Sequence, residues 1–431
     1  MVKSLFRNIV LLVVFAFADA NGQKARERFV GNGWARNTVN TVIFRSDAVV
    51  SDKNWQFTAF YDKDANVVVA KRKLNSDEWE TKKTRFIGKA QDAHNSISIA
   101  LDGAGFLHLS FDHHDSKLRY AVSKKRYGLD FSDEVPMVGN DENKVTYPEF
   151  HKLENGNLLF LYRSGASGRG NLVLNKYDLK TRKWTRIHEN LVDGQNQRSA
   201  YWQTCTSGGK IYISWTWRET YDVSTNHDLC FAMSDDEGKT WKKSSGETYQ
   251  LPITEASAEK IWNIPQNSSL INQTAMTVDE SGNPYIATYW KTGEIPQYKV
   301  VYLNDGKWQM SDSGFRKTPF DLGGGGTKRI PVSRPKLLVD SNKMYLIFRD
   351  EERGNKLSIA QSQKPFATWT VSDISDEDLA QWEPNYDRNL WKTKKQLHIF
   401  AQKTTQIDGE GLLETSELPV KIIEITFPKS H

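Results

Sequence analysis

Histidines and cations recur at one end of the short apolar segments of this chain. Several of these segments are followed at once by side chains that transfer protons or carry charge. These residues are Asp112, His113, His114, Arg163, Arg218, Lys291, Arg349 and Asp350. Imidazole transfers protons near neutral pH, and guanidinium binds carboxylates through paired hydrogen bonds. Ordinary solvated strand ends would not explain why so many of these side chains occupy the same position after a strand. The pattern therefore indicates a site for acid–base chemistry or anion binding.

Three further polar segments precede apolar strands. They contain His94 in residues 92–97, Tyr147 in residues 146–150, and Tyr201 in residues 199–203. If each segment forms the innermost strand of a repeated unit, these side chains line a central axis beside His114 and Arg163. A buried structural histidine is the alternative interpretation of His94 taken alone.

Seven similar pairs of strands supply the elements that must position these residues. The first strands are expected at residues 55–61, 106–111, 157–162, 210–215, 284–289, 344–348 and 396–400. The second strands are expected at residues 67–71, 118–123, 172–177, 229–234, 298–302, 357–361 and 421–426. These segments are rich in β-branched and aromatic residues, and no long stretch has helical periodicity. Because radial repetition protects sheet edges, the sequence predicts an all-β fold, a seven-bladed β-propeller.

One repeat carries a sharper marker of this architecture. Residues 234–241 read Ser-Asp-Asp-Glu-Gly-Lys-Thr-Trp, the S-x-D-x-G-x-T-W pattern of the Asp-box hairpin of sialidase-like propellers. Asp236 and Gly238 are expected to make the turn, and Trp241 is expected to pack between blades. The motif therefore predicts a fold element rather than chemistry.

Composition narrows the class of protein. The balance of 58 basic and 53 acidic residues gives a net charge of only +5, which does not fit a general nucleic-acid binder. Apolar residues 9–18 follow Lys3 and Arg7 and precede Ala-Asp-Ala, which predicts a signal peptide over residues 1–20 and a secreted or periplasmic protein. The apolar run is too short to span a membrane. Residues 21–431 contain no linker-like stretch and are expected to form a single catalytic domain.

A set of motifs resembles one family, the β-propeller ulvan lyases and their BNR-repeat neighbours. The motifs lie at residues 33–35, 92–99, 109–114, 146–150, 162–171, 225–230, 264–269 and 348–353. The resemblance extends from about residue 30 to residue 400. The spacings of 20 residues from His94 to His114 and 16 residues from Tyr147 to Arg163 both suit it.

The resemblance implies β-elimination of a 4-linked uronic acid. Removal of H5 requires that the charge of the neighbouring carboxylate be neutralised, and Arg163 suits this role with assistance from His114. The resemblance makes His94 the leading proton shuttle, with Tyr147 as its partner and Tyr201 positioning the sugar. The sequence does not assign base and acid between His94 and Tyr147. A register error of one residue would replace His114 by His113.

The implied partner is an anionic, sulfated, uronate-containing polysaccharide such as ulvan, and the chemistry requires no cofactor. Lys328 and Arg349 are the predicted substrate contacts, within a local basic patch that also includes Lys291, Arg334 and Arg353. A rhamnose-glucuronate exo-lyase or an α-L-rhamnosidase is the alternative within the same family. The related hydrolases rely on an early histidine, and residues 21–93 contain none, which favours the lyase. A non-catalytic glycan-binding propeller is the third interpretation.

Cys205, His227 and Cys230 form a separate group. His-x-x-Cys with a distant cysteine can begin a structural zinc site, although no fourth ligand is evident. A disulfide between the two cysteines and two inert thiols are the alternatives. The first and third strands of one blade would lie about 10 Å apart, which is too far for a disulfide.

Overall fold

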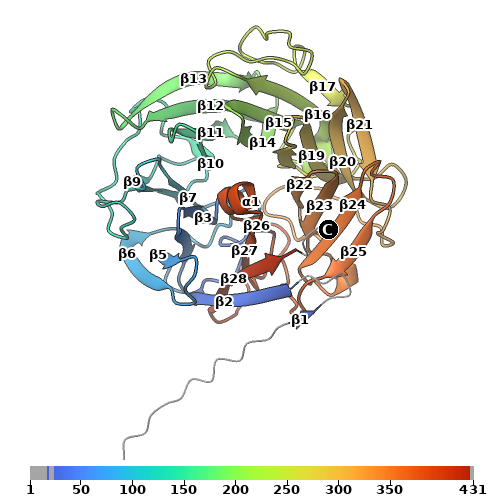
Figure 1. Cartoon of the computed structure of the whole chain (residues 1–431). Coiled ribbons are helices and arrows are strands. Elements are labelled where there is room, and N and C mark those ends of the chain that lie inside the picture. The colour runs from blue at the N-terminus through green and yellow to red at the C-terminus, as the bar shows by residue number, and fades with distance from the viewer. Residues whose placement is uncertain (1–16, 19–23, 428–431) are drawn as a thin grey trace, which may run out of the picture.

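Strands dominate the computed structural model, which describes residues 17–18 and 24–427 (Figure 1). The described residues include one α-helix, α1 (Arg388–Lys394), and two 3₁₀ turns, Val223–Thr225 and Glu351–Arg353. The all-β prediction is therefore confirmed. Residues 1–16 and 19–20 of the predicted signal peptide lie outside the described residues.

Antiparallel pairing organises the strands into sheets. One sheet contains β3 (Val49–Asp52), β4 (Trp55–Tyr61), β5 (Asn66–Lys73) and β6 (Glu80–Ile87). The next contains β7 (Ile97–Leu101), β8 (Leu107–Phe111) and β9 (Tyr120–Val122). A later sheet contains β18 (Ala275–Val278), β19 (Pro284–Trp290), β20 (Gln297–Asn304) and β21 (Lys307–Asp312). Another contains β22 (Lys336–Asp340), β23 (Lys343–Phe348), β24 (Ser358–Gln363) and β25 (Thr370–Asp373).

The largest sheet has eight strands. Its first half contains β10 (Val145–Lys152), β11 (Leu158–Ala166), β12 (Arg169–Asp178) and β13 (Lys183–Asp193). Its second half contains β14 (Ser199–Ser207), β15 (Lys210–Arg218), β16 (Asn226–Ser234) and β17 (Glu259–Trp262). Among the named strands of the described chain, the halves pair only at Gly170 and Ser199, which are parallel, whereas pairing within each half is antiparallel.

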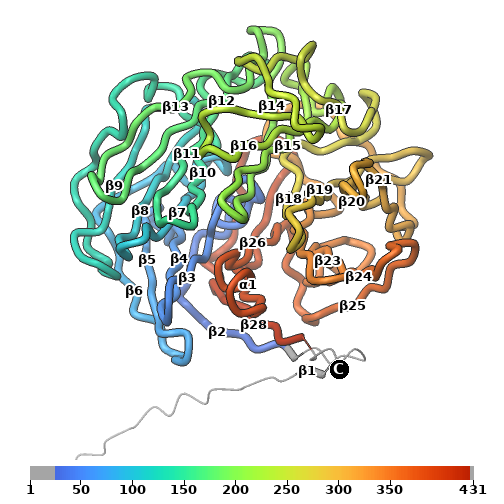
Figure 2. The backbone as a smooth tube through the Cα atoms, turned by 45° about the horizontal axis from the view of Figure 1, so that its top comes forward, coloured from blue at the N-terminus to red at the C-terminus, as the bar shows by residue number. Residues whose placement is uncertain are grey.

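The two ends of the described chain share one sheet. It contains β1 (Phe17–Ala18), β2 (Lys24–Gly33), β28 (Leu418–Thr426), β27 (Leu397–Gln402) and β26 (Asn385–Tyr386). Strand β2 pairs antiparallel with β28 along most of its length (Figure 2). This pairing brings strands from both ends of the described chain into one sheet, so the arrangement around the centre is held closed by main-chain hydrogen bonds.

The sheets surround a common centre, with α1 near the middle of the view (Figure 1). Strands β3, β7, β10, β14, β18 and β22 contact one another in this order, and β26 contacts β3. No residue of these innermost strands is exposed, and β10 is buried over all but its last residue. Polar side chains on them therefore converge on the centre, as the repeat pattern predicts.

Each of the fourteen strands expected from the apolar pattern is present, with ends displaced by a few residues at most. The Asp-box hairpin also forms as expected. The Asp236 carboxylate accepts hydrogen bonds from the backbone N–H groups of Lys239 and Thr240, and Gly238 adopts a φ of 88°. The Trp241 ring is fully buried in a hydrophobic cluster, which anchors the hairpin to the core.

Candidate active site

Asp92 holds two histidines together. Its Oδ1 lies 2.9 Å from Nδ1 of His94, and its Oδ2 lies 2.6 Å from Nδ1 of His114. Oδ1 also accepts the backbone N–H of His94, which fixes the turn between β6 and β7. The two imidazoles stack with ring centroids 4.0 Å apart, and Phe44 stacks on the other side of His94 at 5.3 Å. One carboxylate and one aromatic ring therefore fix the orientation of both histidines.

His114, and not His113, faces this cluster. The His114 side chain is 37% exposed, whereas His113 is fully buried. The Nε2 of His113 accepts the backbone N–H of Arg119, and burial lowers the pKa of His113 to about 3. Of the two histidines that the sequence left open, the structure therefore places His114 beside His94.

Tyr147 lies beside His94 on an irregular part of β10. Its ring centroid is 6.0 Å from that of His94 and 5.0 Å from that of Phe44. The pairing of β10 with β11 shifts register between Thr146 and Glu149, and Tyr147 has a φ of 56°. A non-glycine residue in this conformation costs about 1–3 kcal/mol, and such strain is concentrated at functional sites.

Arg163 and Tyr201 complete the group. The Arg163 guanidinium lies 4.9 Å from the ring centroid of Tyr147, and its Nη1 donates to the Tyr201 hydroxyl at 3.3 Å. The Tyr201 hydroxyl also lies 2.9 Å from Oγ of Ser167. A second guanidinium, that of Arg218, lies 5.4 Å from the centroid of the Tyr201 ring. The structure thus brings together all five predicted residues, His94, His114, Tyr147, Arg163 and Tyr201.

The titrating groups of this cluster are shifted in different directions. Burial lowers the pKa of His94, although the hydrogen bond to Asp92 opposes this. Burial raises the pKa of Tyr147, and the neighbouring Tyr201 raises it further. Burial also opposes ionisation of Tyr201, but the charges of Arg163 and Arg218 lower the pKa of Tyr201 below its ordinary value. The site therefore combines a neutral imidazole, a protonated phenol and a phenol with a lowered pKa.

The ligand atoms of Asp92, His94 and His114 lie within 4.8 Å of one another. Within the described ranges, these residues are the one group of three or more histidine, cysteine or carboxylate side chains with the spacing to hold a metal ion. In the structure both carboxylate oxygens of Asp92 are hydrogen-bonded to the imidazoles instead. Burial acts to raise the pKa of the Asp92 carboxyl, but the bonds to His114 and His94 lower it far below its usual range.

The two cations predicted to contact substrate are already engaged. The Nζ of Lys328 lies 2.6 Å from the Asp408 carboxylate. Arg349 is 1% exposed, and its guanidinium donates to the carbonyl oxygens of Ile330, Pro331 and Trp382. Arg349 therefore belongs to the core and not to a substrate surface. The sequence pattern marked it because it follows an apolar strand, but its hydrogen-bond acceptors come from loops that no local pattern reveals.

The predicted zinc site does not assemble. Cys205 on β14 pairs with Tyr212, and Cys230 on β16 pairs with Trp215, so strand β15 separates the two cysteines. Both are free thiols, and burial raises the pKa of Cys205 to about 12. Both ring nitrogens of His227 already contact carboxylates, Nδ1 that of Asp228 and Nε2 that of Glu219. The spacing in sequence was therefore misleading, because the whole of strand β15 lies between Cys205 and Cys230 in the sheet.

Four contributors to the site received no specific role in the sequence analysis, although Arg218 was among the cations noted at strand ends. These are Asp92, Phe44, Ser167 and Arg218. The Asp-x-His spacing of Asp92 and His94 was a usable signal, because an aspartate often accepts the backbone N–H two residues later. Phe44 lies in an irregular segment with no strand pattern and gave no such signal.

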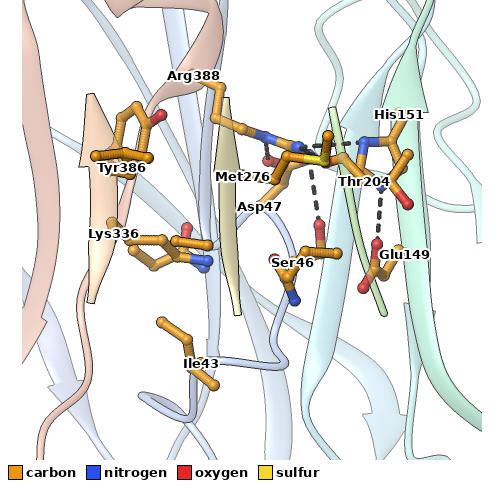
Figure 3. Close-up of a pocket in the computed structure, with 14 residues that line it drawn as sticks. Ile43, Ser46, Asp47, Glu149, His151, Thr204, Met276, Lys336, Tyr386 and Arg388 are labelled. Atoms are coloured by element: carbon orange, nitrogen blue, oxygen red, sulfur yellow. Dashed lines mark hydrogen bonds and ion pairs between the residues drawn. The ribbon is translucent and has the colours of Figure 1, made fainter. Parts of the chain in front are cut away.

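A small cavity of ≈ 30 Å³ lies among the inner strands, apart from this cluster (Figure 3). Its charged groups bind one another: Arg388 contacts the Asp47 carboxylate at 2.7 Å and Nδ1 of His151 at 3.1 Å, and His151 contacts Glu149 at 2.9 Å. Burial raises the pKa of Glu149 to about 8 and lowers the pKa of Lys336 to about 8. The cavity has room for about one water molecule, so these residues brace the centre of the fold rather than hold a sugar.

No helix among the described residues is both long enough and apolar enough to cross a lipid bilayer. The fold and site together define an all-β protein whose inner strands converge on a buried group of proton-transferring and cationic side chains. The model of the BNR repeat-containing family matches residues 55–315, and the chain belongs to this family. This membership confirms the resemblance drawn from the sequence motifs.

Relatives of known activity are similar over part of their length. An ulvan lyase (short isoform) of Alteromonas sp. (strain LOR) is 26% identical over 209 residues, which cover 42% of this chain and 40% of that protein. An ulvan lyase of Nonlabens ulvanivorans is 24% identical over 242 residues, covering 46% of this chain and 48% of the relative. The chain thus spans about half the length of the curated relatives it matches.

Solved structures share the fold over nearly the whole chain. The polysaccharide lyase Uly1 superposes with a TM-score of 0.71 and 16% identity, covering 93% of this chain and 98% of that one. A PL25 ulvan lyase bound to -[GlcA(1-4)Rha3S]- superposes with a TM-score of 0.67 and 15% identity, covering 92% and 94%. At this identity the likeness establishes the architecture alone.

Proposed function

We propose that this protein is a polysaccharide lyase that cleaves ulvan at a 4-linked uronic acid by β-elimination. The observation that carries the proposal is the grouping of Arg163, His94 and Tyr147 around one site, because β-elimination needs a fixed cation, a base and an acid within reach of one sugar. The ulvan lyase relatives supply the substrate class.

The shifted pKa values suggest how the roles divide. His94, kept neutral by burial, takes H5 of the uronate, and the electron pair of that C–H bond forms the C4–C5 double bond as the C4–O4 bond breaks. Tyr147, kept protonated by burial, gives its proton to the departing O4. Arg163 neutralises the carboxylate, so that negative charge developing on it is stabilised, and Tyr201 holds the sugar. No cofactor takes part in these steps.

We further propose a seven-bladed propeller as the scaffold. Dividing the eight-stranded sheet at the single Gly170–Ser199 pair gives two four-stranded blades, and the remaining five sheets bring the total to seven. Export through the predicted signal peptide fits this function, because a polysaccharide substrate does not cross a membrane. Residues 21–431 would then form one secreted or periplasmic catalytic domain.

Incubation with purified ulvan tests the reaction class. The products should carry 4,5-unsaturated uronate ends, detected by their ultraviolet absorbance, with no net uptake of water. New reducing ends without this absorbance would identify a hydrolase such as a rhamnosidase. Binding of ulvan without any cleavage would identify a glycan-binding propeller. A panel of ulvan, heparinoids, alginate and rhamnose-capped arabinogalactan defines the substrate class.

Asp92 is expected to act as a positioning residue for both histidines. Asp92→Asn should lower kcat about 10- to 100-fold, because an orienting carboxylate fixes ring position and tautomer. The carboxylate also raises the pKa of His94 relative to burial alone, so its loss should move the acid limb of the kcat/KM profile to lower pH. Measured pH–rate profiles of the variant and the wild type check both effects.

Asp115→Asn is the matched control, because Asp115 is an exposed carboxylate one residue after His114 and accepts no hydrogen bond from either imidazole. It should retain the wild-type acid limb. An Asp92→Asn variant with a lowered kcat but an unmoved acid limb would contradict the positioning role and leave only a structural one.

A further inference from the structure

A groove of ≈ 1140 Å³ is continuous with the candidate active site, because Asp92 and His114 line both. Its walls come from three loops, at residues 89–95, 112–119 and 134–143. A space of this size exceeds the cavities that hold single small ligands, which reach about 1,000 Å³. It therefore has room for sugars on one side of the reacting uronate.

Most charged groups in the groove already have hydrogen-bond partners. Arg119 contacts the carboxylates of Asp112 and Glu134, each at 2.8 Å. The Glu142 carboxylate is largely buried and accepts the backbone N–H of Val138 at 2.6 Å. Asp92 is bound to the two imidazoles, as described above. Each of these carboxylates is therefore already engaged by a hydrogen-bond donor of the protein.

Lys89 and Lys117 are the exceptions. Both line the groove, and both are exposed. Within the part of the chain that the structure describes, neither ammonium group forms an ion pair. The cations that the sequence had suggested are paired instead, including Lys328 with Asp408, Arg334 with Glu383, and Arg353 with Asp373. Exposed lysines without an ion pair therefore lie beside the site in this groove, whereas Lys328, Arg334 and Arg353 of the predicted patch are paired.

We propose that Lys89 and Lys117 bind sulfate ester groups on the sugars adjacent to the uronate and so make the enzyme selective for sulfated polymer. This inference rests on the proposed lyase function. A sulfate ester stays ionised at all working pH values and accepts hydrogen bonds in several directions, which suits the flexible ammonium group of lysine. Because both lysines are exposed, their attraction for sulfate is modest and decreases with salt.

The double variant Lys89→Ala/Lys117→Ala tests the inference. Its kcat/KM should be compared with that of the wild type on native ulvan and on chemically desulfated ulvan, both followed by ultraviolet absorbance. The wild-type preference for sulfated polymer should shrink about tenfold, mainly through KM, since exposed charge pairs contribute modestly and additively. Added salt should reduce the wild-type preference more than that of the variant.

Lys210→Ala/Lys307→Ala is the matched control. Both control lysines are exposed, neither lines the groove, and Lys210 begins β15 at the end opposite Arg218. The control should keep the wild-type preference. Equal losses by the groove variant on both polymers, or an unchanged preference, would overturn sulfate recognition.

Affinity electrophoresis in gels containing sulfated or desulfated ulvan gives a readout that does not depend on catalysis. Selective retardation of the wild type by sulfated polymer, reduced in the groove variant, supports the inference even if no unsaturated product forms. In that case only the lyase function fails. Retardation of both proteins to the same extent would overturn the role of the two lysines.

Discussion

Arg163→Ala should lower kcat/KM on ulvan about 100- to 1000-fold, the loss expected when one fixed group that stabilises developing negative charge is removed. The side chain is 2% exposed and is held by Gly165, through its carbonyl oxygen at 3.1 Å, and by the Tyr201 hydroxyl. Its charge is therefore placed before substrate binds. Steady-state kinetics by ultraviolet absorbance measures the loss.

Two companion variants separate charge from packing. Arg163→Met retains much of the side-chain volume without the charge and should be as inactive as Arg163→Ala. Arg163→Lys retains the charge but not the planar pairing geometry, and it should recover only part of the activity. Thermal unfolding should show each variant folded. An active, folded Arg163→Met would refute carboxylate neutralisation by this residue.

The strands could be predicted because their signal is local. Residues 107–111 and 284–290, for example, alternate or run apolar over five to seven positions, and this suffices to indicate β8 and β19. The inner-strand placement of Tyr147 and Tyr201 followed from the repeat, because equivalent positions in successive units face the same centre. Site residues carried on regular strands were therefore accessible from sequence.

Pairing between distant loops could not be predicted in the same way. Whether Lys328 is free depends on Asp408, 80 residues away in a segment without regular structure. The need for glycine at position 170 is equally non-local, because a Cβ there would lie 2.6 Å from the Arg163 side chain. The failed zinc prediction has the same origin, since spacing along the chain does not reveal that β15 lies between Cys205 and Cys230.

His94→Ala and Tyr147→Phe should each lower kcat at least about 100-fold, because each removes one proton-transferring group. The two residues are neighbours in one cluster, with ring centroids 6.0 Å apart, and are proposed to act on the same sugar in one step. The double variant should therefore be far more active than the product of the two single losses predicts. Losses that simply multiply would show that the residues act independently.

The pH dependence assigns the roles. As the base, His94 must be neutral; because burial lowers its pKa below 6.5, the wild-type kcat/KM should rise with pH along an acid limb centred below that value. Tyr147, as the acid, must be protonated; because burial raises its pKa above 10.0, it should cause no loss of activity below that pH.

Tyr147→Phe should keep the acid limb, whereas His94→Ala should abolish it in whatever activity remains. His188→Ala, which changes a histidine on the outer strand β13, should keep both the wild-type rate and the limb. An acid limb that survives in His94→Ala and disappears in Tyr147→Phe would exchange the two roles, and a His94→Ala variant with near-normal turnover would remove this residue from the mechanism.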